Sequence, residues 1–360
     1  MGDALRIAVV VGPTSGGIGR HVHAVVRQLV AQGHFVVVVA PSATDDLLGW
    51  RATGARLVTT PVGESSPAAV GRAVSSIRAA AKGVDVIHAH GVRAGAVAAL
   101  ARVHPLVVTW HNARPARWQR RLVHPVAERL AARASDVALA VSPDLLARAR
   151  QAGAGHAALV PAPAPEVPAP SRVPAEVRAS LGVGDRPLVL AVARLEAQKR
   201  LDLLVDATAG WASRPDGPVV AVAGTGRLAE TLTRRAKTVG SPLVLLGRRD
   251  DVPDLMRAAD LVVLPSAWEG YPLAAQEALQ LGVPLVATAV GGVPTLVGDA
   301  ARLVVPGDPA ALRTALEELL RDESERARLS RAGVQRAATW PTLAASVNEL
   351  VGIYRNLVVR

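Results

Sequence analysis

The feature that most constrains this 360-residue chain is a regular alternation of short apolar, β-branched runs with stretches of helical periodicity. The runs contain few polar residues, so strands formed from them would be buried on both faces, as in parallel sheets covered by helices. The runs occupy residues 6–11, 34–40, 84–90, 105–111, 136–142, 187–195, 218–224, 242–247, 260–266 and 283–290. This pattern predicts an α/β protein with doubly wound parallel sheets.

A proline-dense segment at residues 161–174 interrupts the alternation near the middle of the chain. It has no helix or strand periodicity, which predicts a semi-rigid linker. The length suits two domains with full cores, so we expect a Rossmann-like N-terminal domain over residues 1–165 and a Rossmann-like C-terminal domain over 166–340. Residues 341–360 are expected to form a helix that packs back on the N-terminal domain.

The chain is basic, with a formal net charge of +11. A basic chain can bind nucleic acid, an anionic membrane or an anionic substrate. Aromatic residues make up only 2% of it, so the stacking platforms of nucleic-acid binding are scarce and we expect no such partner. Nearly all the positive charge is arginine, and codon bias in a GC-rich genome is an alternative explanation of the excess.

Cysteine is absent from the sequence, which excludes disulfides, thiolate metal sites and a cysteine nucleophile. No apolar run approaches the roughly 18 residues of a membrane span. The first strand-like run begins without a basic region before it, so we expect no signal peptide. These features favour a cytoplasmic location.

A glycine-rich loop joins the first apolar run to an amphipathic stretch, the layout of a phosphate site at a helix N-terminus. Gly12 and Gly17 have the spacing of a Walker A loop, but Ile18 and Gly19 stand where Lys and Ser/Thr are needed. Gly17 and Gly19 begin a G-x-G-x-x-G fingerprint, but position 22 is Val22. The loop therefore suits an anion without matching a common nucleotide motif.

Two segments of the second half carry groups suited to a sugar diphosphate. Arg194 ends a predicted strand, and Lys199 follows five residues later at the start of a predicted helix. A planar guanidinium with a point charge suits two phosphates. Glu269 and Glu277 flank the start of a predicted helix whose first turn includes Pro272. Carboxylates suit pairs of sugar hydroxyls, because one carboxylate can accept two hydrogen bonds. An ordinary surface role for the two cations is the alternative.

These motifs together resemble the signature of family 4 of the retaining glycosyltransferases, the glycosyl transferases group 1. The resemblance covers almost the whole chain and implies the GT-B fold, in which two Rossmann-like domains face a cleft. It rests on Ser15-Gly16-Gly17-Ile18-Gly19-Arg20, Arg194 with Lys199, residues 247–260, Glu269-Gly270-Tyr271-Pro272-Leu273 with Glu277-Ala278, and Val290-Gly291-Gly292-Val293-Pro294.

The resemblance implies a role for each segment. Arg194 and Lys199 would hold the donor's diphosphate, and Glu277 would take the ribose hydroxyls. Gly16 and Gly17 would let the N-terminal domain close on the phosphates. The donor sugar would contact the segment that leads into the helix: Glu269, Gly270, Tyr271, Pro272 and Leu273.

His111 ends the apolar run 105–111 and matches the family's active-site histidine beside the transferred sugar. The implied catalytic set is therefore His111, Glu269, Arg194 and Lys199. The implied reaction moves a hexosyl unit from a UDP- or GDP-linked donor, bound by the C-terminal domain, to a hydroxyl of a lipid-linked, saccharide or small-molecule acceptor, bound by the N-terminal domain. No cofactor is implied, and no metal is expected because the chain has no Asp-x-Asp.

Other interpretations stay open at this stage. A sugar-nucleotide epimerase on the same fold would release nucleotide without consuming an acceptor, and a non-catalytic protein would only bind the sugar nucleotide. His88 and His90 are a packed pair or an acceptor contact; a zinc site has little support. The family usually has an Asn-Gly-Val-Asp-like stretch where this chain has prolines 161, 163 and 165, which affects the hinge more than the chemistry.

A last candidate is the arginine-rich stretch over residues 112–135. Its arginines are interleaved with apolar side chains, so it could lie on the anionic inner face of a membrane and bring the enzyme to a lipid acceptor. A solvated helix face is the alternative. The arginines are Arg114, Arg117, Arg120, Arg121, Arg129 and Arg133.

Overall fold

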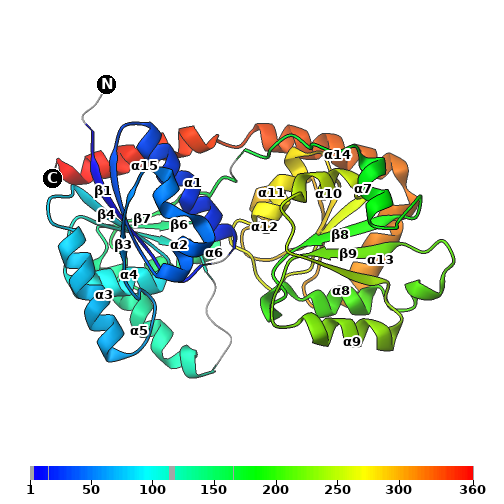
Figure 1. Cartoon of the computed structure of the whole chain (residues 1–360), viewed down its shortest axis with the longest axis horizontal. Helices are drawn as coiled ribbons and strands as arrows, with labels where there is room; N and C mark the ends of the chain where they lie inside the picture. Colours follow the sequence, from blue (N-terminus) through cyan, green and yellow to red (C-terminus); the bar gives the residue numbers. More distant parts are fainter. Residues whose placement is uncertain (1–3, 15, 113–117, 165, 360) are drawn as a thin grey trace. The chain divides into compact units, whose positions relative to one another are not determined.

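The structure is a computed structural model that describes residues 4–14, 16–112, 118–164 and 166–359; the side chains of residues 118–123 are also outside the description. It divides into two compact units. The first comprises residues 1–165 and 341–360, and the second comprises residues 166–340. Each unit is built around a parallel sheet with helices on both faces (Figure 1).

The first unit contains a seven-stranded sheet in the order β3-β2-β1-β4-β5-β6-β7. Its strands are β1 (Arg6–Val11), β2 (Phe35–Ala40), β3 (Arg56–Thr59), β4 (Val86–His90), β5 (Leu106–Trp110), β6 (Val137–Ala140) and β7 (Ala157–Leu159). Its helices are α1 (Gly17–Ala31), α2 (Ser42–Leu48), η1 (Trp50–Thr53), α3 (Pro67–Ala80), α4 (Val92–Ala101), α5 (Trp118–Ala134), α6 (Pro143–Gln151) and α15 (Leu343–Val358).

The final helix α15 contributes to the core of the first unit. Helices α1 and α15 contact each other on one face of the sheet, and α3, α4 and α5 cover the other (Figure 1). Val347, Leu350, Val351 and Tyr354 of α15 are buried in the same cluster as side chains of β1, β2 and α1. Residues distant in sequence therefore stabilise one core.

The second unit contains a six-stranded sheet in the order β10-β9-β8-β11-β12-β13. Its strands are β8 (Leu188–Val192), β9 (Val219–Ala223), β10 (Leu243–Gly247), β11 (Leu261–Leu264), β12 (Leu285–Thr288) and β13 (Arg302–Val304). Its helices are α7 (Pro174–Ser180), η2 (Ala197–Lys199), α8 (Leu201–Ala207), η3 (Trp211–Ser213), α9 (Ala229–Val239), α10 (Val252–Ala258), α11 (Leu273–Gln280), α12 (Val293–Val297), α13 (Pro309–Arg321) and α14 (Glu323–Ala338).

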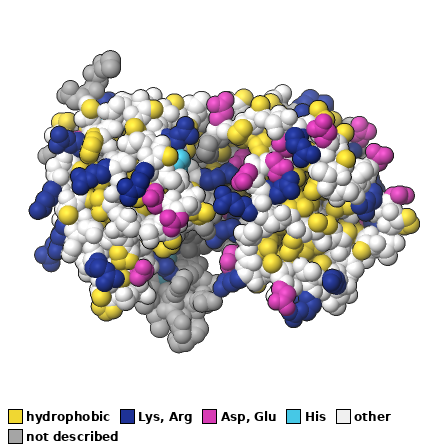
Figure 2. All heavy atoms as spheres, in the orientation of Figure 1, with side chains coloured by type: hydrophobic (Ala, Val, Ile, Leu, Met, Phe, Trp, Pro, Cys, Tyr) yellow, Lys and Arg dark blue, Asp and Glu magenta, His cyan; other side chains and the backbone are white. Residues whose placement is uncertain are grey.

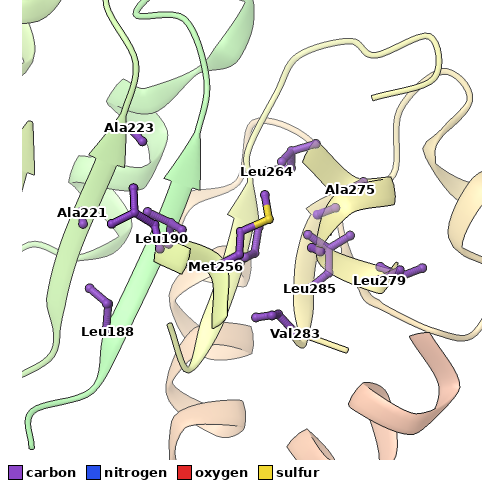
Figure 3. Close-up of a cluster of buried hydrophobic side chains, with 14 of the residues drawn as sticks. Leu188, Leu190, Ala221, Ala223, Met256, Leu264, Ala275, Leu279, Val283 and Leu285 are labelled. Atoms are coloured by element: carbon purple, nitrogen blue, oxygen red, sulfur yellow. The ribbon is translucent and has the colours of Figure 1, made fainter. Parts of the chain in front are cut away.

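Both faces of the second sheet are buried, which explains the continuous apolar runs. Along β8, Leu188 and Leu190 point into one core, while Val189 and Ala191 point into the other. Figure 3 shows the first of these cores, in which Met256 lies among strand and helix side chains. The expectation of doubly wound parallel sheets is confirmed.

Three strands are not predicted by the sequence pattern: β3, β7 and β13. Each has only three or four residues and lies at an edge of its sheet. Most of their side chains are exposed or half-buried. Because these strands are short and their side chains are mostly not buried, they leave no continuous apolar run in the sequence.

The proline-dense segment is tied to both units. At its start, Nδ1 of His21 lies 3.2 Å from the carbonyl oxygen of Pro163. Towards its end, the backbone N–H groups of Ser171 and Arg172 donate to Oδ1 of Asp254 at 2.6 and 3.1 Å. A proline-dense segment forms no regular helix or strand, so its backbone polar groups need other partners. These hydrogen bonds supply some of them.

Many of the arginines make local ion pairs. Figure 2 shows Lys and Arg side chains interspersed with Asp and Glu over the face in view. The Arg235 guanidinium donates to both carboxylate oxygens of Asp206 at 2.6 Å, and Arg328 pairs with Glu325 at 2.6 Å. Exposed pairs of this kind contribute little stability. Arginines in such pairs have partners within the protein, so their presence does not require an anionic ligand.

The role of α15 predicts that Leu350→Ala destabilises the first unit selectively. Truncating a buried leucine costs about 2–5 kcal/mol of unfolding free energy. Hydrogen-exchange mass spectrometry should show faster exchange in β1, β2 and α1, with the second unit unchanged. Glu349→Ala, on the exposed side of the same helix, is the matched control. Equal protection of the first unit in both variants would contradict this role.

Candidate functional site

The candidate residues of the second unit follow its two central strands. Strands β8 and β11 are neighbours, and the strand order reverses between them. Arg194 and Lys199 come after β8, and Glu269 comes after β11. Ligands bind at the carboxyl ends of strands at such a switch point in open α/β sheets.

Lys199 and Glu269 form an ion pair at this switch point. The distance from Nζ of Lys199 to Oε1 of Glu269 is 2.6 Å, and Oγ of Ser266 donates to the same oxygen at 2.6 Å. The Glu269 side chain is 7% exposed, so its charge needs these two donors. Both bonds fall on Oε1, so among the described residues Oε2 is the oxygen left to accept from a ligand.

The loop that carries Glu269 is clamped on two sides. On the η2 side, Nε2 of Gln198 donates to the carbonyl oxygen of Trp268 at 2.8 Å, and N–H of Ala267 donates to the carbonyl of Gln198 at 2.9 Å. On the other side, N–H of Gly292 donates to the Glu269 carbonyl at 3.0 Å. A Cβ at Gly291 would lie 1.9 Å from that carbonyl oxygen, so only glycine fits there.

Arg194 is exposed and lies two residues after β8, which ends at Val192 and not at Arg194 as the sequence pattern predicts. Among the described residues, its guanidinium has no ion-pair partner, so it can receive an anion.

Gly224 and Gly226 pack closely against the loop that carries Arg194. A Cβ at Gly224 would lie 1.9 Å from the Ala193 carbonyl oxygen, and a Cβ at Gly226 would lie 2.5 Å from that of Leu195.

Two helix boundaries differ from the sequence prediction by one or two residues. Lys199 ends η2 and does not start α8, which begins at Leu201 after Arg200 in a left-handed conformation with φ of 48°. Helix α11 begins at Leu273, so Pro272 is its N-cap and not part of its first turn. Proline has no side-chain acceptor, so it leaves the first amides of α11 without a side-chain cap of its own.

The remaining signature residues are mostly buried. Glu277 lies on α11 with 8% exposure, and Gly270 and Leu273 are also buried. Tyr271 is half-buried against the core of the second unit, and this burial raises the pKa of its hydroxyl. Some residues of the glycosyltransferase signature therefore pack in the core of the second unit, and others present polar groups at the carboxyl ends of its strands.

In the first unit, the glycine loop leads from β1 into α1. Gly16 is the N-cap of α1 and Gly17 is exposed; Ser15 lies outside the described residues. Gly19 packs closely, because a Cβ there would lie 2.9 Å from Cδ1 of Leu48. Among the described residues the first turn of α1 has no acidic side chain, so none from that turn competes with an anionic ligand.

His111 follows β5 and belongs to a buried group of histidines. Its Nε2 lies 3.0 Å from Nδ1 of His90, at the end of β4, and its ring is 6.0 Å from that of His21. Burial first, and neighbouring histidines second, hold the pKa values of His90 and His111 well below the usual 6.5. Burial also lowers the pKa of His21 to about 4. The rings are neutral at neutral pH.

His88 is a packed histidine. Its Nδ1 lies 2.6 Å from the hydroxyl of Tyr354, and its Nε2 lies 2.6 Å from Oγ1 of Thr109. Burial lowers its pKa to about 3. Both ring nitrogens are therefore used within the protein, which favours packing over acceptor contact. Within the described ranges, no group of three metal-binding side chains has the arrangement of a metal site.

Sequence reasoning missed several contributors to these groups. Ser266 is the last residue of an apolar run and the first polar residue after β11, a signal that could have marked it. Tyr354 gives no local signal, because it reaches His88 from a helix 266 positions away.

The arginine-rich stretch is only partly described. Arg114 and Arg117, and the side chains of Arg120 and Arg121, lie outside the described residues. On the described part of α5, Arg129 and Arg133 are exposed, as are Val126 and Leu130. The buried Glu128 pairs with Arg148 and His124. Membrane contact stays a prediction; across the described part of the chain, no helix is long and apolar enough to span a membrane.

Two family models match the chain. The model of glycosyl transferases group 1 matches residues 174–336, and the model of a glycosyl transferase 4-like domain matches residues 16–165. Together they match most of both units. The 4-like domain model matches residues of the first unit alone, and the group 1 model matches residues of the second unit alone.

Individual proteins resemble the chain more distantly. It is 30% identical over 189 residues to alpha-D-kanosaminyltransferase of Streptomyces kanamyceticus, covering 51% of this chain and 49% of that protein. It is 35% identical over 201 residues to D-inositol 3-phosphate glycosyltransferase of Xylanimonas cellulosilytica, covering 51% and 46%. The chain thus spans about half the length of the curated relatives it matches.

Among solved structures, Anabaena HepE in complex with UDP-glucose has the same fold. The TM-score is 0.83 at 22% identity, covering 98% of this chain and 100% of that one. Two parallel sheets, the ordered glycosyltransferase motifs and the two family matches agree. The chain belongs to family 4 of the glycosyltransferases, the glycosyl transferases group 1, and has the GT-B fold.

Proposed function

We propose that the protein is a retaining glycosyltransferase. It moves a hexosyl unit from a UDP- or GDP-linked sugar to a hydroxyl of a lipid-linked, saccharide or small-molecule acceptor. The observation that carries this proposal is the Lys199–Glu269–Ser266 group at the switch point of the second unit, together with the exposed Arg194 five residues before Lys199. The names of the relatives support it, since they are sugar transferases.

The contacts of this group suit a sugar diphosphate. An ammonium has three donors, so Lys199 can keep its bond to Glu269 and offer two more to phosphate oxygens. Arg194 adds a planar fork for a second phosphate. Oε2 of Glu269 can accept from sugar hydroxyls, and Glu277 from the ribose. The backbone from Gly270 to Leu273 lines the start of α11, whose dipole favours an anion.

The first unit is proposed to bind the acceptor and to supply His111. In the reaction, the bond from the anomeric carbon to the diphosphate oxygen breaks and a bond to the acceptor oxygen forms on the same face. The acceptor's proton passes to the departing diphosphate. Arg194, Lys199 and the α11 amides stabilise the charge that develops on the leaving group.

Product analysis separates this proposal from its two rivals. A transferase releases nucleoside diphosphate in step with the glycosylated acceptor. An epimerase on the same fold would release nucleotide without consuming an acceptor. A non-catalytic protein would bind the donor and release nothing.

Lys199→Ala should lower kcat more than it raises KM, because the charge it meets grows in the transition state. One such electrostatic donor contributes about 10²–10³ in rate. Arg194→Lys should also be poorly tolerated, since a point charge does not replace a guanidinium fork. Steady-state kinetics with the donor that the protein binds, alongside circular dichroism, measures both effects.

Lys237→Ala is the matched control, because Lys237 is exposed on α9, outside every motif. It should keep the wild-type kcat. If Lys199→Ala is folded and behaves as Lys237→Ala does, the proposed diphosphate site is wrong.

Turnover should continue in excess EDTA. The charge that a Mg²⁺ ion would neutralise is met in this proposal by Arg194, Lys199 and the α11 amino end, and the sequence has no Asp-x-Asp. The measurement is initial rate with and without chelator. A loss of rate that Mg²⁺ or Mn²⁺ restores would overturn metal independence and leave the donor site itself untouched.

A further inference from the structure

The bond between His90 and His111 determines where the proton on His111 lies. Nδ1 of His90 is 3.0 Å from Nε2 of His111, and both rings are buried. A neutral imidazole has one N–H donor and one acceptor nitrogen. One ring must therefore donate and the other accept, so the tautomers of the two rings are linked.

The other nitrogen of His90 discriminates between the two possibilities. Nε2 of His90 is buried and has no hydrogen-bond partner within the described ranges. If His111 donated, His90 would carry its own proton on Nε2 as an orphaned buried N–H. Orphaned N–H groups are rarer in proteins than unsatisfied acceptors. The favoured arrangement places the proton of His90 on Nδ1, from which it donates to His111.

We infer that His90 is a positioning residue that fixes His111 as the Nδ1–H tautomer. Nε2 of His111 is then occupied by the His90 donor. Nδ1–H is the remaining polar group of the ring, and it can donate to a substrate oxygen but cannot accept a proton.

This assignment deepens the proposed function and, for its link to rate, rests on it. His111 would hydrogen-bond to a hydroxyl oxygen of the sugar and would not act as a general base towards the acceptor. The acceptor's proton would have to leave by another route, which agrees with its transfer to the departing diphosphate.

The ring of His90 is itself held in place. The His88 ring lies against it with centroids 4.1 Å apart, and the His111 ring meets it at the hydrogen-bonded edge, with centroids 5.3 Å apart and planes 26° from parallel. His88 is fixed in turn by Tyr354 and Thr109, each at 2.6 Å. Helix α15 therefore supports the orientation of His90 through a buried hydrogen bond. This support limits the freedom of the ring to choose another partner.

Nuclear magnetic resonance reads the tautomer without any substrate. Two-bond ¹H–¹⁵N correlation spectra of the full chain, labelled at histidine, distinguish protonated from bare ring nitrogens near pH 7.5. The signals of His111 are those lost in His111→Gln. We expect the proton on Nδ1 of His111 and on Nδ1 of His90. A proton on Nε2 of His111 would overturn the inference.

Two substitutions of His90 differ in whether they keep the donor. In His90→Asn the side-chain amide can take the place of Nδ1, so His111 should stay the Nδ1–H tautomer. In His90→Leu the donor is gone, and the preference for Nδ1–H should be lost. His23→Asn, on α1 and outside this hydrogen bond, is the control that should leave the His111 signals unchanged. An unchanged tautomer in a folded His90→Leu would contradict the inference.

Kinetics then tests the link to the reaction. With the donor that the protein turns over, His90→Leu should lower kcat about ten- to hundred-fold, the loss seen when the hydrogen-bond partner of a metal-binding histidine is removed. His90→Asn should keep most of the wild-type kcat. If the tautomer changes and kcat does not, the tautomer assignment stands and the proposed role of His111 in transfer fails. The two failures are therefore distinguishable.

Discussion

A buried carboxylate at the carboxyl end of the second sheet organises the candidate site. The buried Glu269 side chain requires hydrogen-bond donors, and Lys199 and Ser266 both donate to one of its oxygens. That requirement brings η2 against the loop after β11, and Gln198 and Gly292 then fix the loop's backbone. The same requirement leaves the second oxygen and the spare donors of Lys199 for a ligand.

The first unit meets its own buried polar groups in another way. The buried His90 and His111 are neutral and hydrogen-bond to each other, and the buried, neutral His88 hydrogen-bonds to the hydroxyls of Thr109 and Tyr354. Neutral rings avoid the desolvation cost of buried charge, which is why burial lowers the pKa of each. The two units thus differ in character: a paired-charge site in one and a neutral, hydrogen-bonded group in the other.

The sequence predicts the central strands and the site segments because both leave local patterns. Buried strands need continuous apolar runs, and Arg194, Lys199 and Glu269 each stand next to one. The edge strands β3, β7 and β13 leave no such run. Contacts made by tertiary packing also leave none: Lys199 and Glu269 are 70 positions apart, and His88 and Tyr354 are 266 apart. The resemblance to a family marks some of these residues as functional. Which residue each of them contacts is visible only in the structure.

The central claim is that the switch point of the second unit binds a nucleoside-diphosphate sugar. The direct measurement is the melting temperature of the protein with UDP-, GDP-, ADP- and TDP-sugars, because a ligand at about 100 times its Kd adds about 2.7 kcal/mol of stability. We predict that at least one sugar nucleotide raises the melting temperature of the wild type and that Arg194→Ala, a change at an exposed side chain, loses most of that rise. No rise with any member, or an equal rise in Arg194→Ala, would contradict the account.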